Sequence, residues 1–342
     1  MPKKILIIQT ASIGDVILST ALAETLHKAF PDAEISYLVR KGYDSLFHNH
    51  PFIRNVFVWD KKRMKYCKLL SLIGQVRRMK FDVVVNVQRF ASSGLITALS
   101  GAPVKSGFVK NPLSFLFTRK SEHRIDIHDN PEHEIVRNHR LIADLVPGKP
   151  LKPRLYPSDA DFETAKHWAR KRFITISPAS LWFTKQYPQD KWVDFINNIS
   201  DDIEVILLGS AADSELCARI SGKSNHENII ILTGIFTLLQ SAALMKYALM
   251  NYTNDSAPMH LASAMNAPVA AVYCSTVPAF GFGPLSDESH IIETTEELPC
   301  RPCGLHGYKS CPLGHFNCAL NIHTEQLLNI LPTDARKDKR RN

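Results

Sequence analysis

Residues 4–30 read KILIIQTASIGDVILSTALAETLHKAF, and this stretch decides the fold. Its first six residues form a short apolar run, which is typical of a strand buried on both faces. From residue 15 onward, Leu18, Leu22 and Leu26 recur at four-residue spacing, which indicates a helix over residues 15–30. The chain therefore opens with a strand that leads through a tight turn into a helix.

The same alternation of strand and helix continues along the chain. Further strands are expected at residues 34–39, 55–59, 82–87 and 104–108, and a helix at residues 132–145. A second series of strands is expected at residues 173–177, 204–208, 228–232, 248–252 and 269–273, with helices at residues 211–220, 238–247 and 258–265. Strands that alternate with helices favour parallel sheets covered on both faces, as in α/β proteins.

Proline crowds the stretch between Pro147 and Pro157, which indicates a linker between two halves. The length of 342 residues suits two domains. We therefore expect two Rossmann-like doubly wound domains, at residues 1–150 and 158–318, that face each other across a cleft. Residues 319–342 are expected to add a terminal helix and a basic tail that includes Arg336 to Arg341. Open α/β sheets bind ligands at the carboxyl ends of their strands.

Composition narrows the class of protein. Hydrophobic residues make up 45% and charged residues 22%, which excludes wholesale disorder. The net charge of +8 favours an anionic partner: a phosphorylated ligand, an acidic membrane or nucleic acid. The first apolar run stops at Gln9, which is too short for a signal peptide. Without an export signal, the seven cysteines suit a reducing cytoplasm.

The first candidate site is the turn at residues 10–15, TASIGD. A dinucleotide-binding turn needs three spaced glycines, and only Gly14 is present, which disfavours a nicotinamide enzyme. Asp15 is instead expected at the start of the helix, facing the cleft. It is either a functional carboxylate or, together with Ser12, a cap of the helix.

The second candidate site is the loop after the strand at residues 173–177. Ser180, Thr184 and Lys185 offer two hydroxyls and an ammonium with no countercharge nearby in sequence. This set suits a phosphate group. The alternative is a surface loop with a solvated lysine.

The third candidate site lies where a strand ends and a helix begins, in NDSAPMHLA at residues 254–262. Pro258 suits the first helical turn, and Asp255 and Ser256 lie near its cap. The free amides of such a turn bind anions. His260 either points at a ligand or is a satisfied core histidine.

The fourth candidate site is a cysteine cluster near the end of the chain. Four cysteines and a histidine fall within nineteen residues: Cys300, Cys303, Cys311, His315 and Cys318. Their spacing resembles a structural zinc knuckle. The alternative is a compact loop whose thiols pack as small hydrophobic groups. No phosphate-binding loop of P-loop NTPases and no nucleophile elbow of α/β-hydrolases is present.

Taken together, these segments resemble the bacterial heptosyltransferases of glycosyltransferase family nine. ILIIQTASIGD at residues 5–15 resembles the opening of that family, and SPASLWFTKQYP at residues 177–188 its P-G-[SA]-x-W-x-x-K-x-W-P loop. NDSAPMHLA resembles its N-D-[ST]-G-P-x-H-[LI]-A segment, with Ala257 in place of the usual glycine. CPLGH at residues 311–315 resembles the tail of the heptosyltransferase II branch. The order and spacing agree from residue 4 to about residue 330.

The resemblance implies a GT-B fold, with the acceptor bound by the first domain and a nucleotide sugar by the second. It implies transfer of heptose from ADP-heptose, with inversion, to the lipid A-core acceptor of lipopolysaccharide. It also implies a cytoplasmic enzyme, peripheral on the inner face of the inner membrane, that needs no cofactor. The final helix, near residues 324–331, is expected to pack back toward the first domain.

The chemistry of inverting transfer fits the candidate residues. One group must accept the proton of the acceptor hydroxyl, and others must stabilise the leaving diphosphate. Asp15 is the candidate base, with Ser12 and Gly14 in the acceptor-side loop. The candidate donor-binding residues are Ser180, Thr184, Lys185, Asp255, Ser256, Ala257 and His260.

Three other functions stay open. A relative of the same family could use another nucleotide sugar or another acceptor. A nucleotide-sugar epimerase of similar architecture would carry a bound nicotinamide. A non-catalytic protein could bind polyanions through its basic surface, although the basic runs lack the interleaved aromatic residues that favour nucleic acid.

Overall fold

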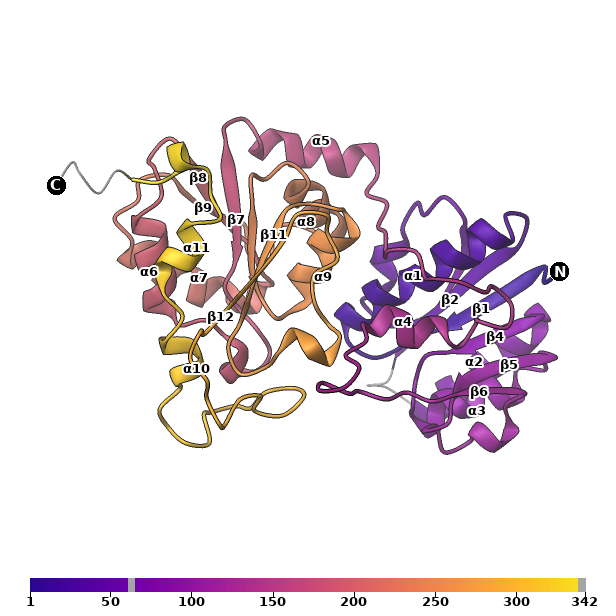
Figure 1. Ribbon diagram of the computed structural model, residues 1–342. Helices are drawn as coiled ribbons and strands as arrows, with labels where there is room; N and C mark the ends of the chain where they lie inside the picture. Colours follow the sequence, from indigo (N-terminus) through magenta and orange to yellow (C-terminus); the bar gives the residue numbers. More distant parts are fainter. Residues whose placement is uncertain (61–64, 338–342) are drawn as a thin grey trace. The chain divides into compact units, whose positions relative to one another are not determined.

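A computed structural model describes residues 1–60 and 65–337 and divides the chain into two compact units. Unit 1 is Met1–Tyr156 and unit 2 is Pro157–Asn342 (Figure 1). Each unit is a parallel sheet with helices between its strands, as the alternation in the sequence predicts. Most of the expected tail, from residue 338 onward, lies outside the described residues.

Unit 1 carries the first six strands. They are β1 (Lys4–Ile8), β2 (Glu34–Arg40), β3 (Ile53–Trp59), β4 (Val83–Asn86), β5 (Val104–Phe108) and β6 (Arg119–Ser121). Its helices are α1 (Ile13–Ala29), α2 (Lys65–Met79), α3 (Ala91–Leu99) and α4 (Glu134–His139), with short 3-10 turns at Asp44–Phe47 and Ser114–Leu116. α4 is shorter than the helix expected at residues 132–145.

Unit 2 repeats the pattern. Its strands are β7 (Phe173–Ser177), β8 (Glu204–Leu207), β9 (Ile229–Ile231), β10 (Asn251–Asn254), β11 (Val269–Tyr273) and β12 (Ser289–Glu293). Its helices are α5 (Asp159–Trp168), α6 (Gln189–Asn197), α7 (Ser214–Lys223), α8 (Leu238–Met245), α9 (Ala257–Ala264), α10 (Asn317–Leu320) and α11 (Thr324–Leu328). A 3-10 turn at Phe183–Lys185 follows β7.

The two sheets share one strand order. It is β3-β2-β1-β4-β5-β6 in unit 1 and β12-β11-β10-β7-β8-β9 in unit 2, which is the same order read from the opposite edge. This is the doubly wound Rossmann order, in which the direction of winding reverses between the first and fourth strands. Ligands of such sheets bind at that reversal. Binding sites are therefore expected at the loops after β1 and β4 in unit 1 and after β7 and β10 in unit 2.

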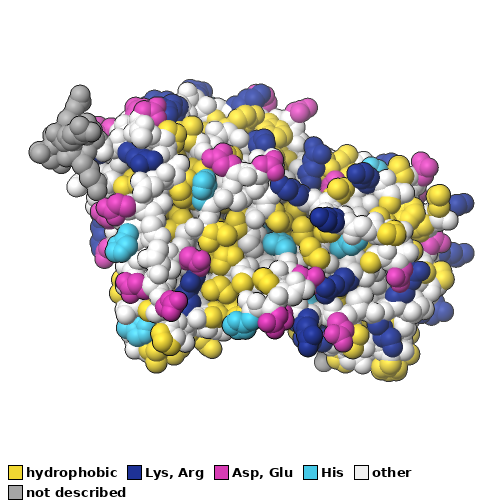
Figure 2. Space-filling view, viewed as in Figure 1, with side chains coloured by type: hydrophobic (Ala, Val, Ile, Leu, Met, Phe, Trp, Pro, Cys, Tyr) yellow, Lys and Arg dark blue, Asp and Glu magenta, His cyan; other side chains and the backbone are white. Residues whose placement is uncertain are grey.

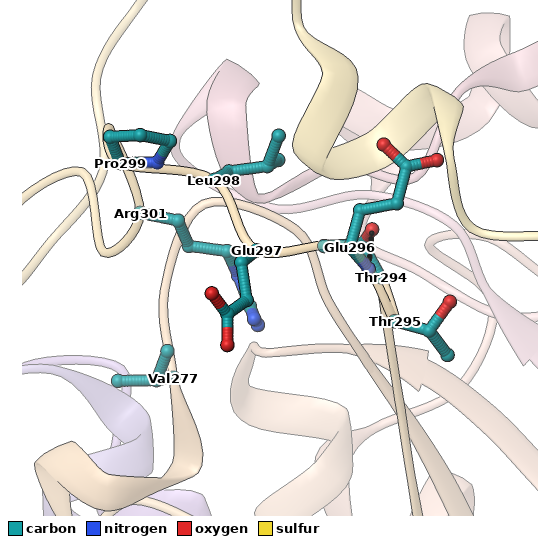
Figure 3. A pocket seen from close by; sticks show the side chains of 8 residues that line it. All are labelled: Val277, Thr294, Thr295, Glu296, Glu297, Leu298, Pro299 and Arg301. Carbon is teal, nitrogen blue, oxygen red and sulfur yellow. Dashed lines mark hydrogen bonds between the residues drawn. The ribbon is translucent and has the colours of Figure 1, made fainter.

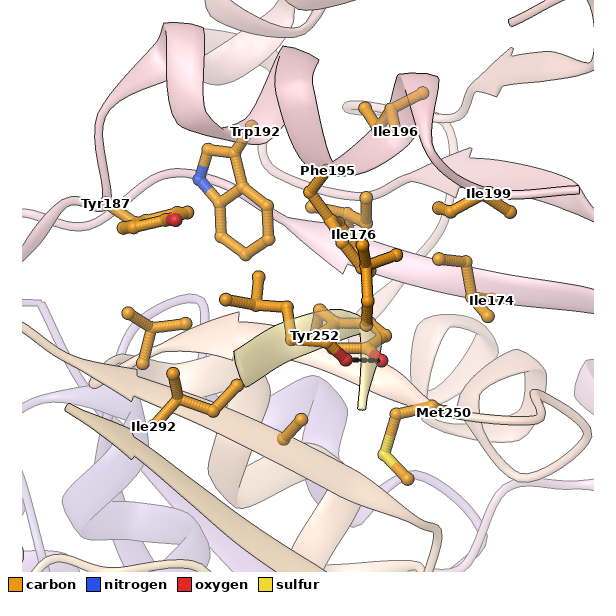
Figure 4. Packing of buried hydrophobic residues seen from close by; sticks show 14 of the residues in the cluster. Ile174, Ile176, Tyr187, Trp192, Phe195, Ile196, Ile199, Met250, Tyr252 and Ile292 are labelled. Carbon is orange, nitrogen blue, oxygen red and sulfur yellow. Dashed lines mark hydrogen bonds between the residues drawn. The ribbon is translucent and has the colours of Figure 1, made fainter. Parts of the chain in front are cut away.

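The core of unit 2 includes the end of the described chain. Trp192, Phe195 and Tyr252 pack together above the sheet (Figure 4), and Leu327 and Leu331 are buried in the same cluster. The Tyr252 hydroxyl donates to the Leu327 carbonyl at 2.9 Å. α11 buries its apolar side chains in this core of unit 2 and packs on α6.

The proline-rich linker is anchored to unit 1. The Leu151 amide donates to Thr25 Oγ1 and the Arg154 amide to Thr20 Oγ1, both at 3.0 Å. The Tyr156 hydroxyl donates to Glu24 on α1 at 3.0 Å. The division between the units therefore falls after Tyr156, six residues beyond the expected end of the first domain.

Charge differs sharply between the two units. Residues 1–156 contain 25 Lys and Arg against 13 Asp and Glu, whereas residues 157–342 contain 16 against 20. On the face shown in Figure 2, dark blue side chains are correspondingly frequent over unit 1. The positive charge of the protein thus belongs to its first half. Over the residues that the structure describes, no helix combines the length and apolar character needed to cross a membrane.

Candidate functional site

In unit 1, Asp15 lies at the winding reversal, in the first turn of α1 directly after β1. Ser12 is the N-cap of this helix, and its hydroxyl oxygen accepts a hydrogen bond from the Asp15 amide at 3.3 Å. Asp15 Oδ2 in turn accepts from the Ser12 amide at 3.1 Å and from the Ser12 hydroxyl at 2.6 Å. Asp15 thus completes a capping box, which is the helix-cap alternative expected from the sequence. Its Oδ1 accepts no hydrogen bond from a described residue.

The surroundings of Asp15 make it a stronger base than an ordinary aspartate. Removal from water raises the pKa of its carboxyl, and the negative charge of Glu134 raises it further. The hydrogen bonds from Ser12 and the charge of Arg89 oppose this shift without cancelling it. A carboxylate with a raised pKa binds a proton more tightly once it is ionised.

Glu134 belongs to a buried charge cluster that sequence reasoning missed. It begins α4, which packs against α1. Both Glu134 oxygens lie 3.0–3.1 Å from His123 Nε2, and Arg137 Nε donates to Oε2 at 2.8 Å. Burial alone would raise the pKa of Glu134, but His123 and Arg137 outweigh it and lower that pKa. Arg137 and the hydrogen bond to His123 thus stabilise the carboxylate form of Glu134, whose charge acts on Asp15.

The loop after β1 is tied to the loop after β4. Gln9 Oε1 accepts hydrogen bonds from the Ala11 amide, at 3.2 Å, and from Gln88 Nε2. The Gln88 amide donates to Asn86 Oδ1 at 2.9 Å. Arg89, whose charge acts on Asp15, follows directly in the chain. The carboxyl ends of the two central strands of unit 1 thus form one hydrogen-bonded edge around Asp15.

In unit 2, the two winding-reversal loops meet through a salt bridge. Lys185 Nζ, in the loop after β7, lies 2.6 Å from Asp255 Oδ2, in the loop after β10. Both side chains are largely withdrawn from solvent. Lys185 has no countercharge nearby in sequence, but the fold brings Asp255 to it from 70 residues later in the chain. The structure brings together two residues that the sequence placed in separate motifs.

Neighbouring groups fix this pair in place. Asp255 Oδ2 also accepts from the Thr276 hydroxyl at 2.7 Å. Asn254, which precedes Asp255, donates from Nδ2 to the Pro178 carbonyl at 2.7 Å and accepts from the Tyr187 amide at 2.9 Å. Asn254 therefore clamps both ends of the loop that carries Lys185. Its signal in the sequence was its place at the start of NDSAPMHLA.

The structure differs from the expectation that the Thr184 hydroxyl binds a phosphate group. Only 1% of this residue is exposed, and its hydroxyl oxygen accepts from the Tyr308 amide at 2.8 Å and from the Ser275 hydroxyl at 3.0 Å. Its backbone amide donates to the Tyr308 carbonyl at 3.1 Å. Thr184 therefore does not present a hydroxyl to a ligand. It holds the Lys185 loop against a later segment of the chain.

The other expected donor-side residues differ in accessibility. Ser180 is half-buried, and only its carbonyl is engaged, by Gln186 Nε2 at 2.7 Å. Ser256 is the N-cap of α9, and its hydroxyl donates to the Asn254 carbonyl at 3.3 Å rather than capping an amide. Ala257 opens the helix and is half-buried, whereas His260 is buried within it. The backbone amides in the first turn of α9 thus receive no hydrogen-bond acceptor from the side chain of the N-cap residue.

The cysteine-bearing segment packs on the Lys185 loop. Gly307 has a φ of +79°, and a Cβ there would lie 2.9 Å from Thr184 Oγ1 and 3.0 Å from Lys185 Cγ. Cys300 Sγ lies 3.8 Å from His315 Nε2, and all seven cysteines of the chain are free. Among the described residues, no three Cys, His, Asp or Glu side chains are grouped as metal ligands. The contacts show that this segment supports Lys185.

A separate cavity of about 550 Å³ lies beyond the end of β12 (Figure 3). It is lined by Val277, Thr294, Thr295, Glu296, Glu297, Leu298, Pro299 and Arg301. Arg301 is already engaged by Glu293 at 2.5 Å and by the Cys274 carbonyl at 2.8 Å. With two further glutamates in its wall, this cavity does not suit a diphosphate. It contains none of the expected donor-binding residues.

A sequence model of glycosyltransferase family 9 (heptosyltransferase) matches residues 69–308. The chain belongs to this family. It is therefore a glycosyltransferase with the GT-B fold, and the resemblance that the motifs predicted is confirmed.

Its relatives are distant but similar over most of their length. The lipopolysaccharide heptosyltransferase 1 of Campylobacter coli is 23% identical over 86% of this chain and 90% of its own. The lipooligosaccharide heptosyltransferase 2 of Campylobacter jejuni is 23% identical over 92% and 93%. The structure of ADP-heptose lps heptosyltransferase II from Escherichia coli matches with a TM-score of 0.78, 22% identity and coverage of 96% and 97%.

Proposed function

We propose that this glycosyltransferase moves heptose from ADP-heptose to the inner core of lipopolysaccharide, with inversion at the transferred carbon. Unit 1 binds the lipid A-core acceptor and unit 2 binds the donor. The observation that carries the proposal is the complementary chemistry of the two winding reversals. One holds a carboxylate with a raised pKa, and the other holds an ammonium beside the first turn of a helix.

Each group has one role in a single displacement. Asp15 takes the proton from the acceptor hydroxyl while that oxygen forms a bond to the anomeric carbon. The bond between that carbon and the diphosphate oxygen breaks, and ADP leaves with the electron pair. Lys185 and the first-turn amides of α9 stabilise the charge on the departing diphosphate, where fixed donors lower the barrier most.

The salt bridge refines the roles in unit 2. Asp255 would repel a diphosphate, so it acts as a positioning residue that directs Lys185. An ammonium has three donors, and the one spent on Asp255 leaves two for phosphate oxygens. Ser180 is the hydroxyl best placed to add a further hydrogen bond, since its side chain is not engaged by any described residue.

The relatives support the choice of substrates, because they are named for transfer of heptose to lipopolysaccharide or lipooligosaccharide. The protein then works at the cytoplasmic face of the inner membrane. The test is a screen of ADP-heptose against ADP-glucose and UDP-sugars, measured by release of nucleoside diphosphate with a lipid A-core acceptor. ADP-heptose is expected to give the highest kcat/KM. A clear preference for another nucleotide sugar would replace the donor, and release from none would overturn the proposal.

A further inference from the structure

An exposed apolar surface lies in unit 1 beyond the carboxyl ends of β4 and β5. Four large side chains are exposed there: Phe90 (61%), Phe115 (70%), Val109 (48%) and Leu116 (46%). The exposed cations Arg89 and Lys110 are next to Phe90 and Val109 in the chain. We call these six residues the Phe90 surface. A cluster of exposed large hydrophobic residues marks an interaction site.

Buried hydrogen bonds hold the two parts of this surface together. Asn111 is buried, and its Nδ2 donates to the carbonyls of Gln88 and Phe90, both at 3.1 Å. The Ser114 hydroxyl donates to the Val109 carbonyl at 2.9 Å, which folds the segment back on itself. A Cβ on Gly94 of α3 would lie 2.2 Å from Asn111 Oδ1, so the helix and this segment are in close contact. The apolar side chains are thus presented by a fixed scaffold.

The same scaffold connects the Phe90 surface to Asp15. Gln88 is hydrogen-bonded to Gln9, which supports the loop before α1. The charge of Arg89 acts on the carboxyl of Asp15. The surface therefore adjoins the edge of the sheet that carries the proposed base, within one unit of the protein.

The charge of unit 1 indicates the partner. Its excess of Lys and Arg contrasts with the slight acidic excess of unit 2 (Figure 2). Exposed aromatic and aliphatic residues beside cations bind the boundary between headgroups and acyl chains of an anionic bilayer. A protein partner would need no such surplus of one charge over the whole unit.

We propose that the Phe90 surface docks unit 1 on an anionic lipid bilayer, with Phe90 and Phe115 entering the headgroup region. The inference rests on the proposed function, because an acceptor anchored in that bilayer would then meet Asp15 at the membrane. It places a membrane contact in unit 1.

The test is co-sedimentation of the full-length protein with vesicles, without donor or acceptor. Vesicles contain phosphatidylcholine alone or with phosphatidylglycerol. Wild-type protein is expected to bind only the anionic vesicles, and more weakly as salt rises. The double variant Phe90→Ser with Phe115→Ser is expected to bind at least tenfold more weakly. The matched control is Ile235→Ser in unit 2, where the side chain is also 61% exposed, and it is expected to bind like wild type.

Two measurements separate docking from other causes. The double variant is expected to keep its thermal unfolding midpoint and to transfer sugar normally to an acceptor dispersed in detergent, while losing transfer to an acceptor in anionic vesicles. Wild-type binding that the double variant retains would overturn the proposal, as would no vesicle binding at all, which would leave a protein partner for this surface. Because vesicle binding needs no nucleotide sugar, a failure of the proposed transfer reaction would not affect this result.

Discussion

Unit 1 and unit 2 have the same strand order and opposite charge. In both units, the candidate residues lie in the loops after the strands that come first and fourth in the chain. These strands are β1 and β4 in unit 1 and β7 and β10 in unit 2. In unit 1 these loops hold Asp15 within a basic half of the molecule, and in unit 2 they hold Lys185 within a slightly acidic half. The difference shows that the fold fixes where chemistry happens, whereas side chains at that place decide which chemistry it is.

The comparison also fits the roles proposed for the two units, a base in unit 1 and a diphosphate-binding group in unit 2. A base must accept a proton, so it gains from surroundings that disfavour its charge, and Asp15 has them. A group that binds diphosphate must be held in position, and the salt bridge to Asp255 holds Lys185. Variants in the two units should therefore fail in different ways.

The largest effect is expected from Asp15→Asn. The amide keeps an oxygen that can accept from the Ser12 amide but cannot take a proton, so kcat should fall by roughly a hundredfold or more. Affinity for ADP, measured by calorimetry, should not change. Because the folded protein disfavours the charge of Asp15, its loss should not lower the thermal unfolding midpoint. A variant that keeps its turnover but unfolds more easily would show that Asp15 is only part of the capping box.

Lys185→Ala should have an effect of similar size, but on the binding of the other substrate. Removing a donor to the developing charge should lower kcat/KM by roughly a hundredfold to a thousandfold. Affinity for ADP should fall as well, which Asp15→Asn should leave intact. Calorimetry with ADP and steady-state kinetics measure the two quantities. Equal ADP affinity in the variant and wild type would remove Lys185 from the donor site.

Glu134→Gln should change the pH dependence of activity. Loss of the negative charge near Asp15 removes a cause that raises the Asp15 pKa, so the acidic limb of the kcat/KM profile should move to lower pH. The limb moves to lower pH because Asp15 must be ionised to act as a base, and a lower pKa keeps it ionised at lower pH. The change also leaves Arg137 without its buried carboxylate, at a cost of roughly 1–3 kcal/mol of stability. An acidic limb that stays in place would argue against coupling between the two carboxyls.

The smallest effect is expected from Gly307→Ala. The new methyl group would press on Thr184 and Lys185, so ADP affinity should fall several-fold. Gly314→Ala is the matched control, because it has a similar φ of +75° but nothing within 4 Å of its Cβ. Both variants should carry the same backbone strain, but only the first should weaken ADP binding. Equal ADP affinities in the two variants would show that the cysteine-bearing segment does not support the donor site.

Local patterns in the sequence predicted most of the architecture. The runs at residues 4–9 and 173–177 became the central strands β1 and β7, because continuous apolar residues are needed where both faces are covered. Two of the four edge strands were not expected from the sequence: β6 is only three residues, Arg119–Ser121, and β12 reads SHIIE. The strand expected at residues 248–252 begins at Asn251 instead, since its polar residues Asn251 and Thr253 are hydrogen-bonded inside the protein or buried.

The candidate site was only partly visible in the sequence. Motifs identified Asp15, Lys185 and Asp255 individually, but the pairing of Lys185 with Asp255 depends on the crossover between β7 and β10. Thr184 looked like a ligand because a hydroxyl in a loop gives no sign of its partners, and Tyr308 lies 124 residues later. Glu134 gave no signal, because its burial and its place near Asp15 depend on the packing of α4 against α1.

The position of α11 in the core of unit 2 has a consequence for synthesis of the protein. Unit 1 is complete once Tyr156 has been made, and it can fold while translation continues. Unit 2 must wait, because Leu327 and Leu331 close the cluster around Tyr252 and the Ile322 carbonyl accepts from the Tyr187 hydroxyl beside the Lys185 loop. A ribosome that stops shortly before residue 322 would therefore release a chain with a finished first half and an unfinished second.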